Sequence, residues 1–393
     1  MKILMLLEWE FPPDVRVENE MLALTEAGHE VHLACSTRKE KPREDSHGKA
    51  IIHRKKISTF VYKSSVGCLK FPFYFSFWKK FVYKLFEKEK FDVIHIHDLP
   101  LSVIGTEIKN LYGIPLVIDL HENWPALIRT AVHTQTFAGR LLSSHKQWID
   151  YERKMLLKAD SIITIVEESK DRIISLGVDK DKICLVSNTL NPQNIPALSV
   201  NKKEESFTIF YGGAINKHRG LQIVFKAISK LADKNIPVNL WIAGEGSYKK
   251  ELEKLSKTLK INPYLRFFGY KPFDEMLKLL AVCDVAIIPH LRTENNDASS
   301  PNKLYQYMYL EKPVISSDCI SLKRIVNETG AGYVYQHDSP DELALLIEKL
   351  VNDRWLIENT GKNGKKAVLE KYNWNNDKTR LIDLYRHLAA KDG

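Results

Sequence analysis

The residues best suited to chemistry stand in two turns in the second half of the chain. In the first turn, residues 211–220 (YGGAINKHRG), Gly212 and Gly213 are followed by the bases Lys217 and Arg219. Glycines let a backbone approach a ligand closely, and the N-terminus of a following helix offers unpaired N–H groups and partial positive charge. This combination suits a diphosphate, although an ordinary strand-to-helix turn with solvated bases explains the same residues equally well.

The second turn, residues 298–308 (ASSPNKLYQYM), predicts another helix start. Ser300 is the expected N-cap and Pro301 the expected first helical residue, which puts Lys303 in the first turn. A lysine there opposes the helix dipole, and a bound anion would offset that cost. We therefore expect a phosphate beside Lys303 and a ribose hydroxyl beside Gln306, one turn further on. The nucleotide-binding residues expected from this turn are Ser299, Ser300, Pro301, Asn302 and Gln306.

Two further turns carry weaker signals. Gly244, Glu245 and Gly246 follow a predicted strand, so a carboxylate between two glycines could form a wall for a nucleobase or ribose. Tyr270 follows the next predicted strand, where main-chain groups could contact a base.

Histidines and carboxylates follow two predicted strands in the first half of the chain. His97 and Asp98 end one strand, and His121 and Glu122 end the next. Histidines at strand ends can bind sugar hydroxyls or assist proton transfer. A metal site is not expected, because no HExxH or Glu-x-x-His spacing is present.

The elements that position these residues alternate between short apolar runs and amphipathic runs of helical spacing. In the first half we predict helices at 17–27 and 140–157 and strands at Lys2–Leu7, Val31–Cys35, Asp92–His97, Pro115–Leu120 and Ser161–Ile165. The second half repeats the pattern, with helices at 221–231 and 248–259 and strands at Phe207–Tyr211, Val238–Ala243, Leu265–Phe268, Val285–Pro289, Pro313–Ser316 and Tyr333–Tyr335. Such alternation is typical of parallel α/β sheets covered by helices on both faces.

Length and composition predict two domains. The chain has 393 residues, and single cores rarely exceed about 300 residues. We expect a Rossmann-like domain at 1–190, a proline- and asparagine-containing linker at 191–205, and a second Rossmann-like domain at 206–373. A helix at 374–393 is expected to cross back to the first domain. Ligands bind beyond the carboxyl ends of strands in open α/β sheets, so an active-site cleft between the two domains follows.

The cysteines, the net charge and the hydropathy of the chain indicate its cellular location. The five cysteines are far apart and form no CxxC pair, which favours a reducing cytoplasm. The N-terminal apolar run is interrupted by Glu8, unlike a signal peptide, and no run approaches the roughly 20 residues of a membrane span. A net charge of +9 favours anionic partners. We expect a cytoplasmic protein, with peripheral contact to the inner membrane face as an open alternative.

The chain resembles the retaining glycosyltransferases of GT-B fold known as group 1 or family 4, over nearly its whole length. The block 299–318 (SSPNKLYQYMYLEKPVISSD) is similar to the family's donor-binding signature, and the 213–220 loop, Gly244–Gly246 and the histidine strand ends fall in the family's order. Residues 11–17 (FPPDVRV) resemble a subgroup's first loop and place Asp14 and Arg16 among the expected substrate-binding residues, with His97, Asp98 and Glu122.

The resemblance implies a hexosyl- or N-acetylhexosaminyltransferase that needs no metal or other cofactor. Its donor would be a nucleotide-diphosphate sugar, with UDP or GDP expected, and its acceptor a saccharide or lipid-linked saccharide in surface polysaccharide or glycolipid synthesis. Arg219 and Lys303 would hold the diphosphate as it departs, His121 would stand by the transferred sugar, and the leaving phosphate would accept the acceptor's proton. These three residues are the expected catalytic set, and closure of the domains over the donor is expected.

Three positions depart from the family pattern. Gln306 replaces a common glutamate, and Ala298 and Ala214 stand where an acidic residue and an arginine are usual. A GT-B epimerase or phosphorylase and a non-catalytic nucleotide-sugar-binding scaffold are therefore alternatives.

The segment Arg54–Lys90 interleaves ten bases with many aromatic residues. This composition suits an anionic membrane surface, and stacking on single-stranded nucleic acid is chemically similar. An ordinary helix packed by its aromatics explains the segment equally well. The lipid-linked acceptor that the family resemblance implies favours membrane contact over nucleic-acid binding for this segment, and we expect no nucleic-acid partner.

Overall fold

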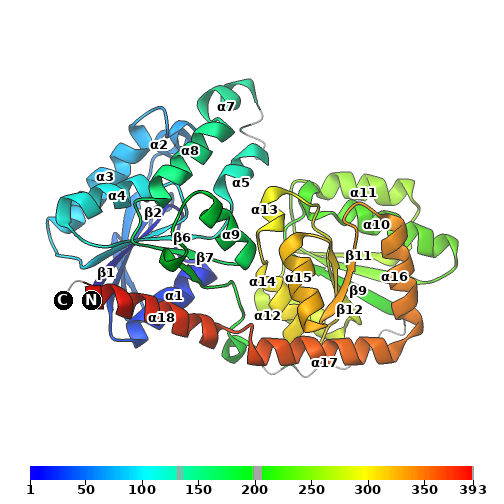
Figure 1. The fold of residues 1–393 in the computed structure, drawn as a ribbon. Coiled ribbons are helices and arrows are strands. Elements are labelled where there is room, and N and C mark those ends of the chain that lie inside the picture. Colours follow the sequence, from blue (N-terminus) through cyan, green and yellow to red (C-terminus); the bar gives the residue numbers. More distant parts are fainter. Residues whose placement is uncertain (131–133, 135, 197, 199–205, 392–393) are drawn as a thin grey trace. The chain divides into compact units, whose positions relative to one another are not determined.

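The structure is a computed structural model that describes residues 1–130, 134, 136–196, 198 and 206–391. Contacts between Cα atoms divide the chain into unit 1, Met1–Ser187 with Asp377–Gly393, and unit 2, Asn188–Asn376 (Figure 1). Within the predicted linker 191–205, residues 197 and 199–205 lie outside the described part.

The sheet of unit 1 has eight strands in the order β3-β4-β2-β1-β5-β6-β7-β8. The strands are β1 Lys2–Leu7, β2 Glu30–Thr37, β3 Glu44–His47, β4 Ala50–Lys56, β5 Val93–His97, β6 Leu116–Leu120, β7 Ser161–Thr164 and β8 Ile183–Leu185. The prediction of parallel pairing is wrong only for β3, which runs antiparallel to β4. Two residues join β3 to β4, and a link that short cannot make the crossover that parallel strands require.

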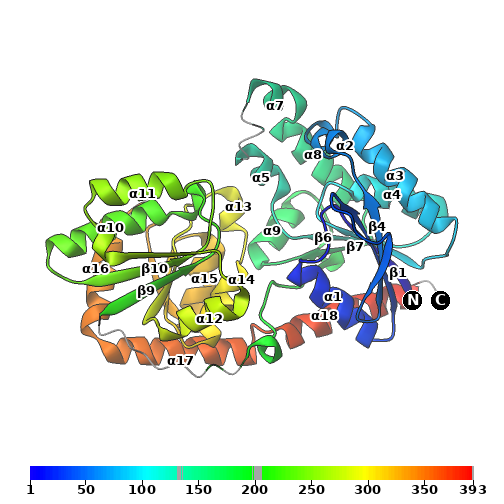
Figure 2. The same cartoon turned by 180° about the vertical axis from the view of Figure 1, so that it is seen from behind.

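Helices pack on both faces of this sheet, as Figures 1 and 2 show. They are α1 Val15–Glu26, α2 Thr59–Lys63, α3 Phe73–Phe86, α4 Ser102–Tyr112, α5 Trp124–Thr130, α7 Phe137–Leu142, α8 His145–Leu156, α9 Glu167–Ser175 and α18 Trp374–Lys391. The single helix predicted at 140–157 is wrong: Ser143 ends α7, and Ser144 starts α8 with a capping box completed by Gln147. The two serines compete with the backbone for hydrogen bonds, which favours a helix boundary.

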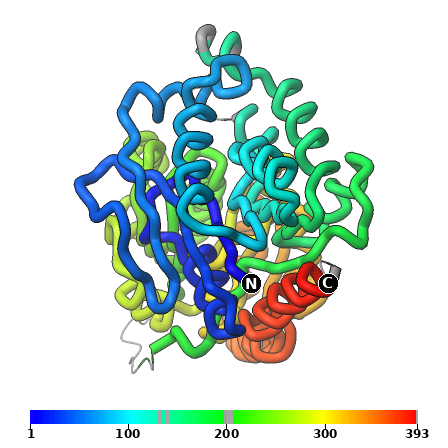
Figure 3. Tube along the Cα trace, turned by 90° about the vertical axis from the view of Figure 1, so that its left-hand side faces the viewer, coloured from blue at the N-terminus to red at the C-terminus, as the bar shows by residue number. Residues whose placement is uncertain are grey.

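The last helix, α18, packs beside α1 within unit 1 (Figure 3). Lys378 of α18 pairs with Glu26 at the end of α1. Deeper in the unit, the Tyr385 hydroxyl lies 2.7 Å from Nδ1 of His95 on β5. The C-terminal helix is therefore part of the packing that surrounds the β5 histidines.

Unit 2 holds a six-stranded parallel sheet in the order β11-β10-β9-β12-β13-β14. Its strands are β9 Phe207–Gly212, β10 Val238–Ala243, β11 Leu265–Gly269, β12 Val285–Ile288, β13 Val314–Ser317 and β14 Gly332–Tyr335. Its helices are α10 Leu221–Asp233, α11 Lys249–Thr258, α12 Phe273–Val282, α13 Glu294–Asp297, α14 Asn302–Tyr309, α15 Ile320–Thr329, α16 Pro340–Asn352 and α17 Arg354–Glu370.

The central strands of both sheets are buried on both faces. Ile3 to Leu6 of β1 have no exposed surface, and the same is true of Ile287 and Ile288 in β12. Such strands read as continuous apolar runs because helices cover both sides. The polar residues that follow these strands are thereby held on a rigid edge.

Candidate active site

In unit 1, three neighbouring strands end in polar residues at the carboxyl edge of the sheet. Glu8 follows β1, Asp98 follows β5 and His121 follows β6. The register pairs Leu6 with Ile96 and Ile96 with Ile118, so these residues leave the sheet at similar heights. Asp98 takes the left-handed conformation (φ 63°), which non-glycine residues other than Asn and Asp rarely adopt.

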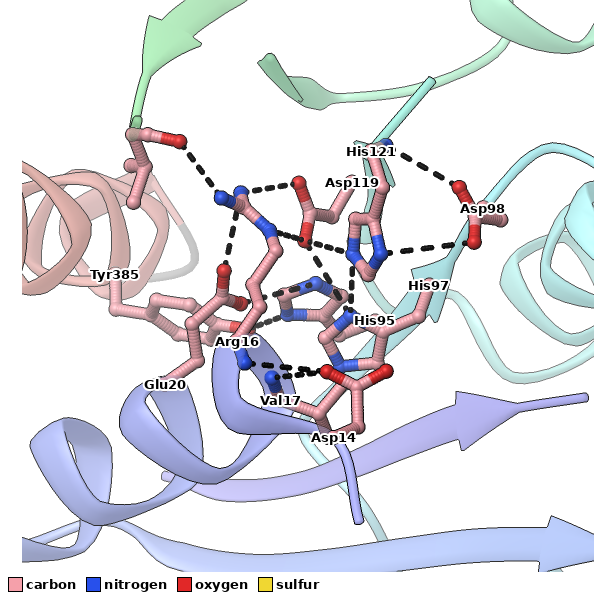
Figure 4. A network of polar contacts seen from close by, with 11 residues as sticks. Asp14, Arg16, Val17, Glu20, His95, His97, Asp98, Asp119, His121 and Tyr385 are labelled. Atoms are coloured by element: carbon pink, nitrogen blue, oxygen red, sulfur yellow. Dashed lines mark hydrogen bonds and ion pairs between the residues drawn. The ribbon is translucent and has the colours of Figure 1, made fainter. Parts of the chain in front are cut away.

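An ion pair between Arg16 and Asp119 forms the centre of a buried network below this edge (Figure 4). Arg16 donates from Nε and Nη2 to the two carboxylate oxygens of Asp119, at 2.9 and 2.7 Å. Its Nη1 donates to the Val186 carbonyl at 2.9 Å, and Nη2 lies 3.1 Å from Glu20. The guanidinium therefore donates its hydrogen bonds to internal partners, and its ion pair with Asp119 holds α1 against β6.

His121 is held between two carboxylates. Its Nε2 lies 2.7 Å from Asp119 Oδ2, and its Nδ1 lies 3.5 Å from Asp98 Oδ2. Burial alone would lower the pKa of His121, but Asp98 and Asp119 outweigh burial and raise that pKa to about 9. The imidazole is therefore a cation at neutral pH, and Arg16 and His121 hold the pKa of Asp119 well below its usual range.

Deeper groups in the network are neutral. Burial holds the pKa of His95 and of His97 below the usual range. Burial and the charge of Asp119 raise the pKa of Glu20 to about 8. Glu20 has no exposed surface, so it stays protonated at neutral pH and adds no charge beside Asp119.

The other predicted residues of unit 1 occupy different environments. Asp14 caps α1 by accepting from the backbone N–H groups of Arg16 and Val17. His97 is fully buried, with Nδ1 3.3 Å from both Asp119 and His121. Glu122 is exposed. The structure thus brings Arg16, His97, Asp98 and His121 into one network and leaves Glu122 at its surface.

Sequence reasoning missed Asp119, Glu20 and Tyr385 as members of this network. Two signals were available. Asp119 is a lone charge within the apolar run of β6, and Glu20 stands four residues after Arg16, on the same face of α1. Tyr385 lies at the far end of the chain, and no sequence pattern connects it with His95.

Four of these side chains could also surround a cation. One atom from each of Glu20, His95, His97 and Asp119 lies within 4.8 Å of the others. Arg16 already contacts the carboxyl groups of Glu20 and Asp119, so a metal ion would compete with the guanidinium. The donor set is therefore accounted for by an ion-pair network.

In unit 2, Arg219 and His290 form a pair at the carboxyl edge of the sheet. Arg219 ends a short 3₁₀ turn after β9, and His290 follows β12. Nη1 of Arg219 donates to Nε2 of His290 at 2.9 Å. Burial and the charge of Arg219 hold the pKa of His290 well below its usual range, so a neutral ring accepts this bond. Arg219 Nε is buried without a partner in the described chain.

Lys303 approaches the same edge from the first turn of α14. Its Nζ lies 4.5 Å from the centre of the Tyr211 ring, a cation–π contact. Gly213 (φ 135°) leaves room for it, because a Cβ there would come within 2.5 Å of that Nζ. Burial and the charge of Arg219 lower the pKa of Lys303 to about 7.

The predicted cap of α14 is wrong. Pro301 occupies the N-cap position, and no side chain caps the helix. The Ser300 hydroxyl instead donates to the Tyr305 hydroxyl at 2.7 Å. Ser300 has almost no exposed surface, and this inward orientation leaves the first N–H groups of α14 without a side-chain cap. Lys303 does stand in the first turn, as predicted.

Close backbone packing explains the glycines of these turns. A Cβ at Gly220 (φ 74°) would overlap the Pro289 carbonyl, and a Cβ at Gly246 would overlap the Ile215 carbonyl. Gly244 meets Gly213 in the same way. The glycines therefore let three strand-end loops of unit 2 touch one another, which positions Lys303 and Arg219.

The remaining predicted nucleotide contacts lie around these loops. Lys217 and Asn302 are exposed, and Gln306 and Ser299 are half-buried. Glu245 pairs with Lys249 at 2.8 Å, and Tyr270 is 79% exposed. Gly212 donates its N–H to the buried Tyr307 hydroxyl.

Solved structures with the same fold identify the class of protein. A sucrose-phosphate synthase from Thermosynechococcus elongatus superposes with a TM-score of 0.78 at 16% identity, covering 100% of both chains. The Anabaena protein HepE, solved in complex with UDP-glucose, superposes with a TM-score of 0.69 at 15% identity, covering 98% of this chain and 100% of that one. The fold is GT-B, the two-domain fold of glycosyltransferases.

Sequence comparisons identify the family. Residues 14–194 match the model described as Glycosyltransferase Family 4, and residues 197–367 match Glycosyl transferases group 1. An uncharacterized glycosyltransferase of Methanocaldococcus jannaschii is 24% identical over 98% of both chains. The phosphatidyl-myo-inositol mannosyltransferase of Mycolicibacterium smegmatis is 23% identical, covering 99% of this chain and 95% of the relative. The chain belongs to the group 1/family 4 glycosyltransferases.

Proposed function

We propose that unit 2 binds the diphosphate of a nucleotide sugar through Arg219 and Lys303. The observation that carries this assignment is a contrast between two arginines. Arg16 has the ionised Asp119 as a partner at 2.7 Å, whereas neither Arg219 nor Lys303 has an anionic partner within the described residues. Two half-buried cations on one edge without internal anions favour an anionic ligand.

The proposed reaction transfers the sugar, with retention of anomeric configuration, to a saccharide or lipid-linked saccharide acceptor. As the glycosidic bond breaks, negative charge grows on the departing diphosphate, and fixed cations stabilise that charge without reorganisation. The leaving phosphate takes the acceptor's proton, so no separate carboxylate base is required. UDP and GDP are the proposed carriers, and a structural neighbour solved with UDP-glucose supports UDP.

His121 is the proposed unit 1 residue at the transferred sugar. Its charge is fixed by Asp98 and Asp119, and both ring nitrogens carry a proton at neutral pH. Nε2 is directed to Asp119 at 2.7 Å, so the proposed donor to the ligand is Nδ1, which lies 3.5 Å from Asp98. A cationic imidazole suits a sugar hydroxyl or a phosphate oxygen better than it suits proton removal. Asp119 and Arg16 are positioning residues that hold this ring.

The proposal is tested by a thermal-shift screen against UDP, GDP, ADP and CMP. A nucleotide present at a hundred times its Kd adds about 2.7 kcal/mol of stability. Stabilisation by one diphosphate is expected, and its nucleotide sugar then serves as donor for NMR assignment of the product's anomeric configuration. Absence of stabilisation by all four nucleotides would contradict nucleotide binding, and an inverted product would contradict retention.

The aromatic segment Arg54–Lys90 divides into two parts in the structure. Most aromatics of α3 pack into the core, including Tyr74, Trp78 and Phe81. Phe60, Phe71 and Phe73 do not: they are 66%, 47% and 49% exposed. Their rings touch, with centroids 5.5 Å apart for Phe60–Phe73 and 6.5 Å apart for Phe71–Phe73.

We propose that this phenylalanine cluster rests on the cytoplasmic face of a membrane that carries the acceptor. An exposed cluster of apolar rings beside lysines is the pattern of an interfacial anchor. No helix in the described residues is both long enough and apolar enough to cross a bilayer. In co-sedimentation with anionic vesicles, replacing the three phenylalanines by serine should release the protein. Replacing Trp355, which is 68% exposed in unit 2, should not. Equal binding by both variants would refute the assignment.

A further inference from the structure

The amino edge of the unit 1 sheet, where its parallel strands begin, carries a second polar cluster. Lys2 is the first residue of β1 and Glu30 the first residue of β2, and the register pairs them directly. His32 stands two residues after Glu30, so the two side chains share one face of the sheet. Glu89 lies in the turn between α3 and β5. These four residues are separate from the network around Asp119, which lies toward the carboxyl edge.

His32 presents one ring nitrogen to two carboxylates. Its Nε2 lies 3.0 Å from Glu30 Oε1 and 3.7 Å from Glu89 Oε2, and one atom from each residue lies within 4.8 Å of the others. Zinc holds imidazole nitrogens and carboxylate oxygens at about 2.0–2.2 Å in tetrahedral geometry, which puts neighbouring ligand atoms roughly 3.3–3.6 Å apart. The two observed separations bracket that range, so small side-chain movements suffice to bring all three atoms onto one ion.

A second histidine orients the His32 ring. His53 pairs with Ala34 in the register, which puts it on the same face of the sheet as His32. Its Nε2 lies 2.9 Å from Nδ1 of His32, and its Nδ1 lies 3.6 Å from the Glu44 carboxylate. Glu44 favours a proton on Nδ1 of His53, so Nε2 of His53 accepts the Nδ1 proton of His32.

This arrangement leaves Nε2 of a neutral His32 with a lone pair that faces two carboxylates. Two neutral imidazoles supply two protons, which are used toward Glu44 and between the rings, so the contact with Glu30 has none. A cation at Nε2 removes the repulsion. Histidines that ligate metals donate their other N–H to an acceptor in this way, and imidazole with carboxylates is a ligand set of zinc.

Lys2 neutralises the two carboxylates but is held less firmly than Arg16. Its Nζ pairs with Glu89 and lies 2.9 Å from Glu30 Oε1. The Arg16 side chain is 7% exposed and is bound through two nitrogens, whereas the Lys2 side chain is 24% exposed and carries a point charge on a flexible stem. Lys2 can turn into solvent, and the exposed Glu30 leaves the cluster open to an entering ion.

We propose that His32, Glu30 and Glu89 bind a structural zinc ion, with water as the fourth ligand and His53 fixing the tautomer of His32. The ion joins β2 to the turn between α3 and β5. It takes no part in glycosyl transfer, because it lies at the edge opposite His121. HExxH and Glu-x-x-His are helical spacings, whereas ligands on one face of a strand recur at every second residue, so those motifs do not reveal this site.

Calorimetric titration of zinc into the chelator-treated full chain tests the site. The wild type should bind zinc, and Glu89→Gln and Glu30→Gln, which keep the shape of each side chain, should each weaken its Kd at least about a hundredfold. Glu18→Gln is the matched control, because Glu18 pairs with His47 at 2.8 Å elsewhere in unit 1. Its zinc affinity should equal that of the wild type.

Replacing Lys2 separates a metal site from a simple ion pair. Lys2→Met removes the competing ammonium group and should tighten zinc binding about tenfold, the scale of the two ion pairs that zinc otherwise has to break. Cobalt in place of zinc reports the ligands, and its visible spectrum should lack the charge-transfer band of a thiolate. A thiolate band would assign the ion to a cysteine and overturn the site.

The remaining outcomes are equally decisive. No zinc binding by the wild type, or equal affinities in the wild type, Glu89→Gln and Glu30→Gln, would overturn the site. Unchanged affinity in Lys2→Met would contradict the placement of the ion between the two carboxylates. Glu89→Gln should keep the wild-type thermal shift with UDP or GDP, because the cluster lies away from the carboxyl edge; loss of that shift would contradict a purely structural ion.

Discussion

Nucleotide binding should take up a proton onto Lys303. The free protein holds the pKa of this lysine at about 7, because burial and Arg219 disfavour its charge. A diphosphate bound at Nζ favours the charged lysine and should raise its pKa toward the ordinary value near 10.5. Only the protonated lysine then binds tightly, so affinity must fall as pH rises above 7.

The magnitude follows from the fraction of protonated lysine. Half of the Lys303 side chains are charged at pH 7 and about one in a hundred at pH 9, so Kd should rise about 50-fold over this interval. Isothermal titration of the nucleotide selected by the thermal screen, at pH 7, 8 and 9, measures the slope. Two buffers of different ionisation enthalpy measure the protons taken up.

Variants of two lysines make this prediction specific. Lys303→Arg keeps a charge that does not titrate below pH 12, so its Kd should be nearly independent of pH. Lys217→Ala, which removes an exposed lysine from the neighbouring turn, should keep the wild-type slope. A flat profile in the wild type, or the same slope in Lys303→Arg, would refute the reasoning about Lys303.

Three further predictions concern stability, each measured as the free energy of unfolding in urea. Gly220→Ala should lose several kcal/mol, about the scale of a strained buried site, because its Cβ would overlap the Pro289 carbonyl at φ 74°; a loss under about 0.5 kcal/mol would contradict this packing. Arg16→Ala should cost about 3–5 kcal/mol because Asp119 stays buried without its partner, and Arg16→Ala with Asp119→Asn should recover part of the loss; equal losses would argue against the pair. For Glu8, the pKa of about 8 in the folded state exceeds the ordinary 4.5, so between these two values the folded state holds a proton that the unfolded state has lost. As pH rises from 4.5 to 8, the wild-type free energy of unfolding should therefore fall by up to about 1.4 kcal/mol per pH unit. Glu8→Gln should remove that fall, and an unchanged pH profile would contradict the shift.

The fold could be predicted from hydrophobic periodicity wherever strands are fully buried. The predicted Lys2–Leu7 and Val238–Ala243 match β1 and β10 residue for residue. The same signal failed for β3 (EDSH), which has no apolar residue and is exposed at the sheet edge. It also failed at 140–157, where helical spacing of apolar residues continues across a serine pair that ends one helix and starts another.

The site could be predicted only in part, because strand ends are visible in sequence and side-chain direction is not. Lys303 and Arg219 follow from their place after strands and at a helix start. Ser300 has the right residue type for a cap, but it points inward to Tyr305. Tertiary packing also decides that Arg16 meets Asp119, 103 residues away, and that Lys303 meets the Tyr211 ring.

The contacts of His290 also could not be predicted from the sequence. Its position after β12 resembles that of the other strand-end residues, but only the structure shows that it holds Arg219. A neutral histidine beside an arginine has no signature in one sequence. Replacing His290 would test this positioning role, because the Arg219 charge that is proposed to bind the diphosphate would remain.

The most direct test of nucleotide-sugar transfer is isothermal titration of UDP and GDP into the wild type and the double variant Arg219→Ala, Lys303→Ala. The account predicts that one of the two nucleotides binds the wild type and that the double variant binds it at least about a hundredfold more weakly, since two charge-assisted contacts are lost. Equal affinities in the two proteins, or no binding of either nucleotide to the wild type, would contradict it.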